Sequence, residues 1–170
     1  MMYGHAYAEG AVTVASMPWY GSEPYMNSAA DVFVEYESST GAANHPFYFD
    51  LDGAYAFSTH KGPTLTGTDG GNTSFFGDDI PTSWNVTGEP DGYPNFFGTS
   101  SAAPTVAGVA ALLKQYAGSD VSNDLIKQAL ISTARDITTD RGSVGWDDVT
   151  GAGEVDAQAA LNYLKDQLGK

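Results

Sequence analysis

The sequence contains no cysteine, few basic residues and no long apolar run. Without cysteine there is no disulfide framework and no thiol chemistry, so cysteine usage does not identify the compartment. Lysine and arginine together number 7, against 21 aspartates and glutamates, which gives a formal net charge of −14. This acidity argues against nucleic acid or an anionic membrane as a partner. The lack of an apolar run of about 18 residues argues against a membrane-spanning helix.

The first residues, Met1 to Gly4, do not begin a signal peptide. The acidic composition suits an extracellular protein, so we expect the protein to be secreted, with any export signal located elsewhere. A length of 170 residues predicts one domain, which could bury roughly two thirds of the surface of its unfolded chain.

The most informative stretch is a turn that leads into an apolar helix. It reads Gly98-Thr99-Ser100-Ser101-Ala102-Ala103-Pro104, and residues 105–116 continue it with apolar residues on nearly every face. This pattern predicts a buried helix. We expect Pro104 in the first helical turn, where its missing N–H costs nothing.

Ser100 would then lie at the start of this helix. Unpaired N–H groups and the positive end of the helix dipole stabilise an oxyanion that forms beside a serine there. The alternative is a Ser/Thr N-cap on an alanine-rich core helix. The physical argument alone favours neither interpretation.

The same stretch closely resembles the nucleophile motif of subtilisin-like serine peptidases, G-T-S-x-A-x-P. The resemblance implies that Ser100 attacks the substrate and that its backbone N–H is one oxyanion donor. Gly98, Thr99 and Pro104 would support the motif. The departures from common family residues, at Ser101 and Thr105, do not carry the chemistry.

Other segments resemble subtilases in the same order along the chain. They are an apolar strand at 11–16, a segment at 62–70 that leads toward the serine, and a closing segment at 151–157. The resemblance implies an α/β fold, part of a three-layer domain with a mainly parallel sheet flanked by helices and a buried central helix that bears the serine. Residues 1–170 would form a single partial domain, the carboxy-terminal portion of the catalytic domain.

A serine hydroxyl is a poor nucleophile unless a neighbouring base accepts its proton and a third group orients that base. Subtilases supply these groups from an Asp-Thr/Ser-Gly segment and a His-Gly-Thr segment. None of the histidines, His5, His45 and His60, is followed by Gly-Thr, so we interpret them as surface or loop residues. The resemblance therefore implies a missing upstream half and an inactive isolated chain.

These observations predict a serine endopeptidase fragment that acts on polypeptide substrates. One alternative is a non-catalytic subtilase remnant. Another is a sedolisin-type fragment with a calcium site, which Asp136-Ile137 and Gly145-Trp146-Asp147 partly resemble. No cofactor is indicated with certainty, and structural calcium is left open. We interpret Asp78, Asp79 and Asp91 as a solvated acidic loop, because no spacing matches an EF-hand-like calcium loop.

Local patterns predict further elements. Residues 31–36 alternate as a half-exposed strand would, and 47–57 suggest two strands around an Asp-Gly turn. Ser122 is a candidate N-cap for an amphipathic helix that ends near Arg135. Asp156 is a candidate cap for a last helix that runs through about Gln167.

Overall fold

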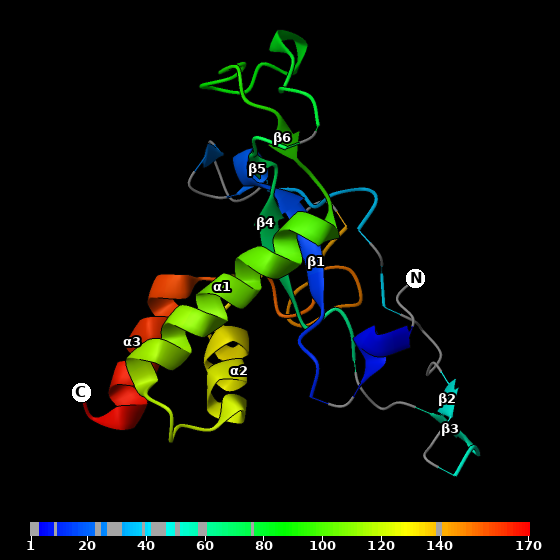
Figure 1. Cartoon of the computed structure of the whole chain (residues 1–170), viewed down its shortest axis with the longest axis vertical. Helices are drawn as coiled ribbons and strands as arrows, with labels where there is room; N and C mark the ends of the chain where they lie inside the picture. The colour runs from blue at the N-terminus through cyan, green and yellow to red at the C-terminus, as the bar shows by residue number, and fades with distance from the viewer. Residues whose placement is uncertain are drawn as a thin grey trace.

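The computed structural model describes residues 4–8, 10–22, 25–26, 32–38, 40–41, 47–49, 52–57, 61–75, 77–138 and 141–170. Short strands dominate the first part of the chain, and α-helices follow from residue 99 onward (Figure 1). Short 3₁₀ segments occur at η1 (Gly4–Tyr7), η2 (Trp19–Gly21) and η5 (Thr82–Trp84).

Two parallel strands form the centre of the molecule. β1 (Val14–Pro18) pairs with β4 (Leu65–Asp69), with Pro18 beside Asp69 at the carboxyl ends of both strands. Glu154 adds a parallel bridge to Thr66, so the closing segment of the chain runs along the other side of β4. The expected α/β character, with parallel strands and flanking helices, is confirmed.

The helix α1 (Thr99–Ala117) packs across β1 and β4 (Figure 1). Gly67 allows this close approach: a Cβ atom there would lie 2.7 Å from Val106 Cγ2 and 2.9 Å from the Ala102 carbonyl oxygen. Since real Cβ atoms do not tolerate such contacts, glycine sets the distance between helix and sheet. The buried core beneath the helices comprises Leu65, Val106, Leu113, Ala117, Ile126, Ala129, Leu130, Ala160 and Leu164.

Both predicted helix caps are confirmed. The helix α2 (Asn123–Ser132) begins after Ser122, whose hydroxyl accepts a hydrogen bond from the Leu125 N–H at 3.2 Å. It ends earlier than expected. The helix α3 (Ala157–Leu168) begins after Asp156, whose carboxylate accepts from the Ala159 N–H at 2.8 Å. Each cap satisfies an N–H that has no partner within its helix.

The predicted hairpin is confirmed as β2 (Phe47–Phe49) and β3 (Tyr55–Phe57), which pair antiparallel around the Asp52–Gly53 turn. A second antiparallel pair joins β5 (Gly71–Asn72) to β6 (Asn95–Phe96). The predicted strand at 31–36 is wrong for its described residues. Val32 and Val34 are buried as the alternation indicates, but residues 32–36 have no strand assignment.

The expectation that the serine-bearing helix is buried on nearly every face is also wrong. α1 buries only Ala102, Val106, Leu113 and Ala117, whereas Leu112 is 67% exposed. The strands β1 and β4 and the helices α2 and α3 contact one side of α1, and no described element covers the other. Among the described residues, no helix is long and apolar enough to cross a membrane.

Candidate functional site

Ser100 lies at the exposed amino-terminal end of α1, as its second residue. The residue before the helix, Gly98, has φ of +93° and ψ of 170°. Residues with a Cβ atom rarely adopt this backbone conformation, whereas glycine does so readily. The Gly98 carbonyl accepts hydrogen bonds from the N–H groups of Ser101 at 2.9 Å and Ala102 at 3.2 Å. Glycine therefore turns the chain sharply into the helix and presents Ser100 at its start.

The backbone N–H of Ser100 has no hydrogen-bond acceptor among the described residues, as expected for the first turn of a helix. The N-cap residue Gly98 has no side chain that could accept from it. An oxygen placed beside this N–H would also meet the positive end of the α1 dipole. This geometry is compatible with stabilisation of a negative charge that forms next to the Ser100 hydroxyl.

Pro104 does not lie in the first turn, and that prediction is wrong. α1 begins at Thr99, which makes Pro104 the sixth helical residue. Its nitrogen stands where an N–H would normally bond to the Ser100 carbonyl four residues earlier, so the helix lacks that bond. The helix begins five residues before Pro104, earlier than the position of the proline suggests.

Asp69 holds the turn that leads to Ser100. Its carboxylate accepts a hydrogen bond from the Gly98 N–H at 2.6 Å, across 29 positions of sequence. Asp69 is the last residue of β4 and only 2% exposed. The neighbouring Gly70 N–H donates to the Phe96 carbonyl at 2.8 Å. The end of β4 and the segment that leads into α1 therefore lie side by side as far as Gly98.

Several acidic groups surround Asp69. Burial raises its pKa to about 6, the charge of Glu37 adds to this, and the Gly98 N–H acts in the opposite direction. Burial also raises the pKa of Glu35 to about 7, helped by the charges of Asp69 and Glu37. Burial raises the pKa of Tyr20 to about 12, with smaller effects from the Glu35 and Asp69 charges.

Of the histidines, only His5 lies within the described residues, where it is exposed in η1. His45 and His60 lie outside them. No described side chain is hydrogen-bonded to the Ser100 hydroxyl. The described part of the chain therefore provides no base for this serine in the observed geometry.

Comparison with known proteins identifies the family. A family model described as the subtilase family matches residues 34–153, well over half of the chain and including the Ser100 turn. The chain belongs to the subtilase family.

The subtilase chain is 32% identical over 153 residues to mycosin-4 of Mycobacterium tuberculosis, a match that covers 89% of this chain and 28% of mycosin-4. A solved protease of Pseudoalteromonas arctica is 28% identical, with a TM-score of 0.53, over 94% of this chain and 38% of the other. A solved psychrophilic subtilisin-like protease from an Antarctic Pseudoalteromonas species is 38% identical over 44% of this chain and 16% of its own, with a TM-score of 0.39. The chain thus spans well under half the length of these relatives.

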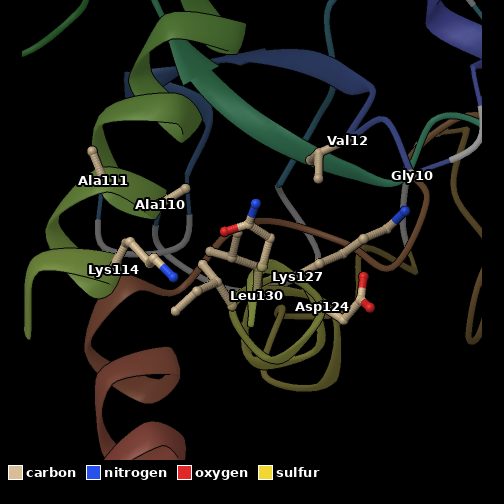
Figure 2. Close-up of a pocket in the computed structure, with 10 residues that line it drawn as sticks. Gly10, Val12, Ala110, Ala111, Lys114, Asp124, Lys127 and Leu130 are labelled. Atoms are coloured by element: carbon tan, nitrogen blue, oxygen red, sulfur yellow. The ribbon is translucent and has the colours of Figure 1, made fainter. Parts of the chain in front are cut away.

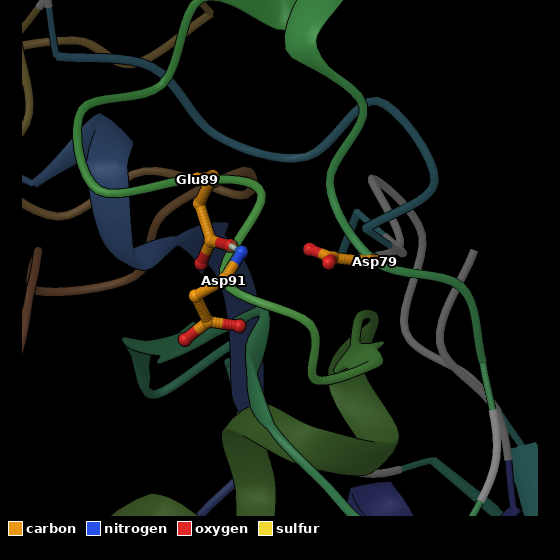
Figure 3. Close-up of side chains that lie close together, drawn as sticks. All are labelled: Asp79, Glu89 and Asp91. Carbon is orange, nitrogen blue, oxygen red and sulfur yellow. Dashed lines mark hydrogen bonds between the residues drawn. The ribbon is translucent and has the colours of Figure 1, made fainter.

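Three carboxylates of this subtilase chain gather in the loop that precedes Ser100. Oxygens of Asp79, Glu89 and Asp91 lie within 4.8 Å of one another (Figure 3). The Asp79 Oδ2 atom accepts from the Gly92 N–H at 2.7 Å, and Asp91 Oδ2 accepts from Asn72 Nδ2 at 2.6 Å. Among the described residues, these are the carboxylates whose spacing could suit a cation.

Asp78 and Asp91 are exposed, as residues of the predicted solvated acidic loop would be. Asp79 differs, because it is half-buried and its Oδ1 atom is buried without a hydrogen-bond partner among the described residues. Nothing in the sequence indicates that Glu89 belongs to this group, because the position of its carboxylate depends on how the loop folds.

Asp147 organises the loop that partly resembles a calcium segment. It accepts hydrogen bonds from the N–H groups of Ser143, Val149 and Thr150, at 2.8 Å each, and from the Thr150 hydroxyl at 3.0 Å. These bonds lower the pKa of Asp147 and outweigh the opposing effect of burial. Asp136 accepts from the Gly145 N–H at 2.7 Å. Both carboxylates therefore bind the loop's own donors.

A cavity of about 320 Å³ opens between α1, α2 and the segment before β1 (Figure 2). Its lining is largely apolar, and the ammonium groups of Lys114 and Lys127 already bind backbone carbonyls, including those of Val121 and Ala11. Its first α1 residue, Ala110, lies roughly 15 Å along the helix from Ser100. The cavity is thus separate from the serine.

Proposed function

We propose that Ser100 is the nucleophile of a serine endopeptidase. The observation that carries this proposal is the exposed position of Ser100 at the start of α1, within the Gly98-Thr99-Ser100 turn of a subtilase chain. The hydroxyl oxygen attacks the carbonyl carbon of a peptide bond, and the amine departs when the tetrahedral intermediate collapses to an acyl-enzyme. Water then releases the acyl group.

The Ser100 N–H is one donor to the oxyanion in this proposal. It supports the negative oxygen of the tetrahedral intermediate because it has no acceptor among the described residues and lies at the positive end of α1. Gly98 and Thr99 shape the turn, and Pro104 removes the helical donor to the Ser100 carbonyl.

The base and the group that orients it would come from polypeptide outside these 170 residues, the upstream half of the catalytic domain. Two observations support this. The sequence has neither an Asp-Thr-Gly nor a His-Gly-Thr segment. The outer side of α1 is apolar and exposed, with small residues that would let another layer of structure approach closely. In this arrangement residues 1–170 form one part of a single domain.

The isolated chain should then show no measurable peptidase turnover. We would incubate it with a chromogenic peptide and with a fluorophosphonate probe, which labels activated serines. Robust labelling of Ser100 in the chain alone would mean that a base within the chain activates it, and the proposed division of the triad would be wrong.

Restoring the upstream half tests the nucleophile itself. The chain would be fused behind a subtilase half that carries both motifs. Ser100→Ala should lower turnover by a factor on the order of 10⁶, the loss seen when the triad serine of subtilisin is removed. The matched control Ser101→Ala should change turnover little. If Ser101→Ala abolished turnover and Ser100→Ala did not, the assignment would fail, and a fusion that never labels would favour the non-catalytic remnant.

The substrate class of this proposal is a polypeptide, and the compartment is extracellular. The formal charge of −14 suits a secreted protein, and family membership supplies the reaction. Secretion is checked by fusing the native upstream sequence to a reporter and measuring the reporter in the culture medium.

A further inference from the structure

We infer that Asp69 is a positioning residue for the nucleophile turn: its carboxylate binds the Gly98 N–H and thereby fixes how α1 presents Ser100. The link to catalysis rests on the proposed function of Ser100. The structural part of the inference, that the Asp69 carboxylate holds the turn, stands on the geometry of the described residues alone.

Among the described residues, the side chain that binds the backbone of this turn is that of Asp69. Asp69 is the last residue of β4, which pairs with β1 from Val14 to Pro18, and its Oδ2 atom lies 2.6 Å from the Gly98 nitrogen. Helix α1 begins at the next residue, Thr99. Gly98 has no side chain to cap the helix, so the hydrogen bond from the sheet is what orients its peptide group.

The hydrogen bond from the Gly98 N–H does not in itself require a charged acceptor at position 69. A neutral amide oxygen could also accept from the Gly98 N–H, without the cost of burying a carboxylate. Asp69 is 2% exposed, and its Oδ1 atom is buried with no partner among the described residues. Hydrogen bonds to charged acceptors are shorter and roughly twice as strong as neutral ones. We therefore attribute the charge to a tighter hold on the turn.

The surroundings make this charge sensitive to acid. The charge of Glu37 raises the pKa of Asp69, and the charge of Asp69 in turn raises the pKa of Glu35 and of the Tyr20 hydroxyl. None of these groups, which come from the 32–38 segment and from η2, is cationic. The amino-terminal end of α1 supplies the favourable partner through Gly98. With the pKa of Asp69 raised to about 6, the carboxylate is charged at pH 8 and largely neutral at pH 5. Acid therefore loosens the turn.

The direct test follows the Gly98 amide proton. The chain would be labelled with ¹⁵N-glycine and its spectrum recorded from pH 8 to pH 4.5. We expect the Gly98 proton resonance far downfield at pH 8, moving upfield in acid with a midpoint near pH 6. Asp69→Asn should abolish this titration. Asp91→Asn, an exposed acid of the preceding loop, is the matched control and should leave the midpoint unchanged.

A second variant keeps the test decisive if Asp69→Asn folds poorly. Glu37→Gln leaves Asp69 in place and removes a repulsive charge, so the Gly98 midpoint should fall by several tenths of a pH unit. If the resonances are broad, the pH dependence of amide hydrogen exchange in the peptide that spans 93–103 replaces the Gly98 chemical shift as the measurement. A Gly98 resonance that does not titrate between pH 5 and pH 7, or one that titrates unchanged in Asp69→Asn, overturns the inference.

The catalytic consequence is read in the reconstituted enzyme. Asp69→Asn should lower kcat at least tenfold at pH 8 with little change in KM. The loss should shrink toward pH 5, where Asp69 of the wild type is itself largely neutral, whereas the acid limb set by the histidine of the upstream half remains in both enzymes. A ratio of the wild-type to the Asp69→Asn kcat that stays constant between pH 8 and pH 5 contradicts the inference. Failure of the proposed function looks different: Ser100→Ala would then retain turnover, while the Gly98 titration would still report on Asp69.

Discussion

Arg135 and Glu154 are joined through both backbone and side chains. Each N–H donates to the other's carbonyl at 2.8 Å, and Arg135 Nη2 lies 3.1 Å from Glu154 Oε2. The Glu154 Oε1 atom also accepts from the Ser22 hydroxyl at 2.6 Å. Since Glu154 bridges to Thr66 of β4, one buried residue connects the closing segment to the sheet, to the end of α2 and to the segment after β1.

Removal of the Glu154 carboxylate should destabilise the fold strongly. Glu154→Ala removes the buried acceptor of the Ser22 hydroxyl and the nearer acidic partner of Arg135, whose side chain is 34% exposed and also lies 4.0 Å from Asp156, so we expect a loss of about 1 to 3 kcal/mol. Chemical denaturation measures the free energy of unfolding. Asp166→Ala, in the exposed part of α3, is the control and should change it by less than about 0.5 kcal/mol. Equal losses in the two variants would contradict the proposed link.

Glycine substitutions in β4 and α1 should have opposite effects. Gly67→Ala forces a methyl group against Val106 and the Ala102 carbonyl, so we expect a loss of about 1 to 3 kcal/mol. Gly108→Ala meets no atom within 4 Å on the exposed side of α1 and should gain about 0.5 to 1 kcal/mol from helix propensity. Thermal unfolding ranks the variants. A stabilising Gly67→Ala would mean that the sheet and α1 are not in close contact.

The exposed apolar side of α1 should make the isolated chain associate. Leu112 is 67% exposed there, so Leu112→Lys should lower the average mass in light scattering at tens of micromolar protein. Val144→Lys removes a residue that is 86% exposed in a loop away from α1, and should not lower it. A monodisperse wild-type monomer with a sharp cooperative melt would count against this expectation.

Stability should rise as the pH falls from 8 to 5. The pKa of Glu35 is raised to about 7 and that of Asp69 to about 6, so the folded chain binds these protons more tightly than the unfolded chain does. Their contribution is complete below about pH 4 and is lost as the pH rises through 6 and 7. Calorimetry should give a Tm several degrees higher at pH 5 than at pH 8, and Glu35→Gln should flatten this dependence. A Tm that falls over this range contradicts it.

A fall in pH would therefore raise the stability of the fold and at the same time weaken the hydrogen bond that holds the turn before Ser100. Protonation of Asp69 relieves the cost of a buried charge, which stabilises the fold. The same proton weakens the hydrogen bond to Gly98. If the inference about Asp69 holds, the pH of greatest stability lies below the pH of greatest turnover.

Local patterns in the sequence predicted local structure well. The Ser122 and Asp156 caps, the strand near residue 14 and the Asp-Gly hairpin depend on residues close together in the chain, and the structure confirms them. The motif around Ser100 also identified the family, which the family model confirms.

Features that depend on distant contacts could not be predicted in this way. The Asp69–Gly98 hydrogen bond spans 29 positions, and the Glu154–Ser22 bond spans 132. Nothing in the spacing of these residues indicates which of them meet. The apolar sequence of α1 predicts a buried helix, and which of its faces these 170 residues leave uncovered depends on contacts with distant segments.

Pro104 leaves the first turns of α1 with one backbone hydrogen bond fewer than a regular helix would have. The bond that it removes is the one that would tie the peptide group of Ser100 to the next turn. The carbonyl of Ser100 is therefore left without its helical donor, whereas the neighbouring carbonyls of Gly98 and Ser101 are bound from within α1, by the N–H groups of Ser101 and Ala102 and by the Thr105 hydroxyl.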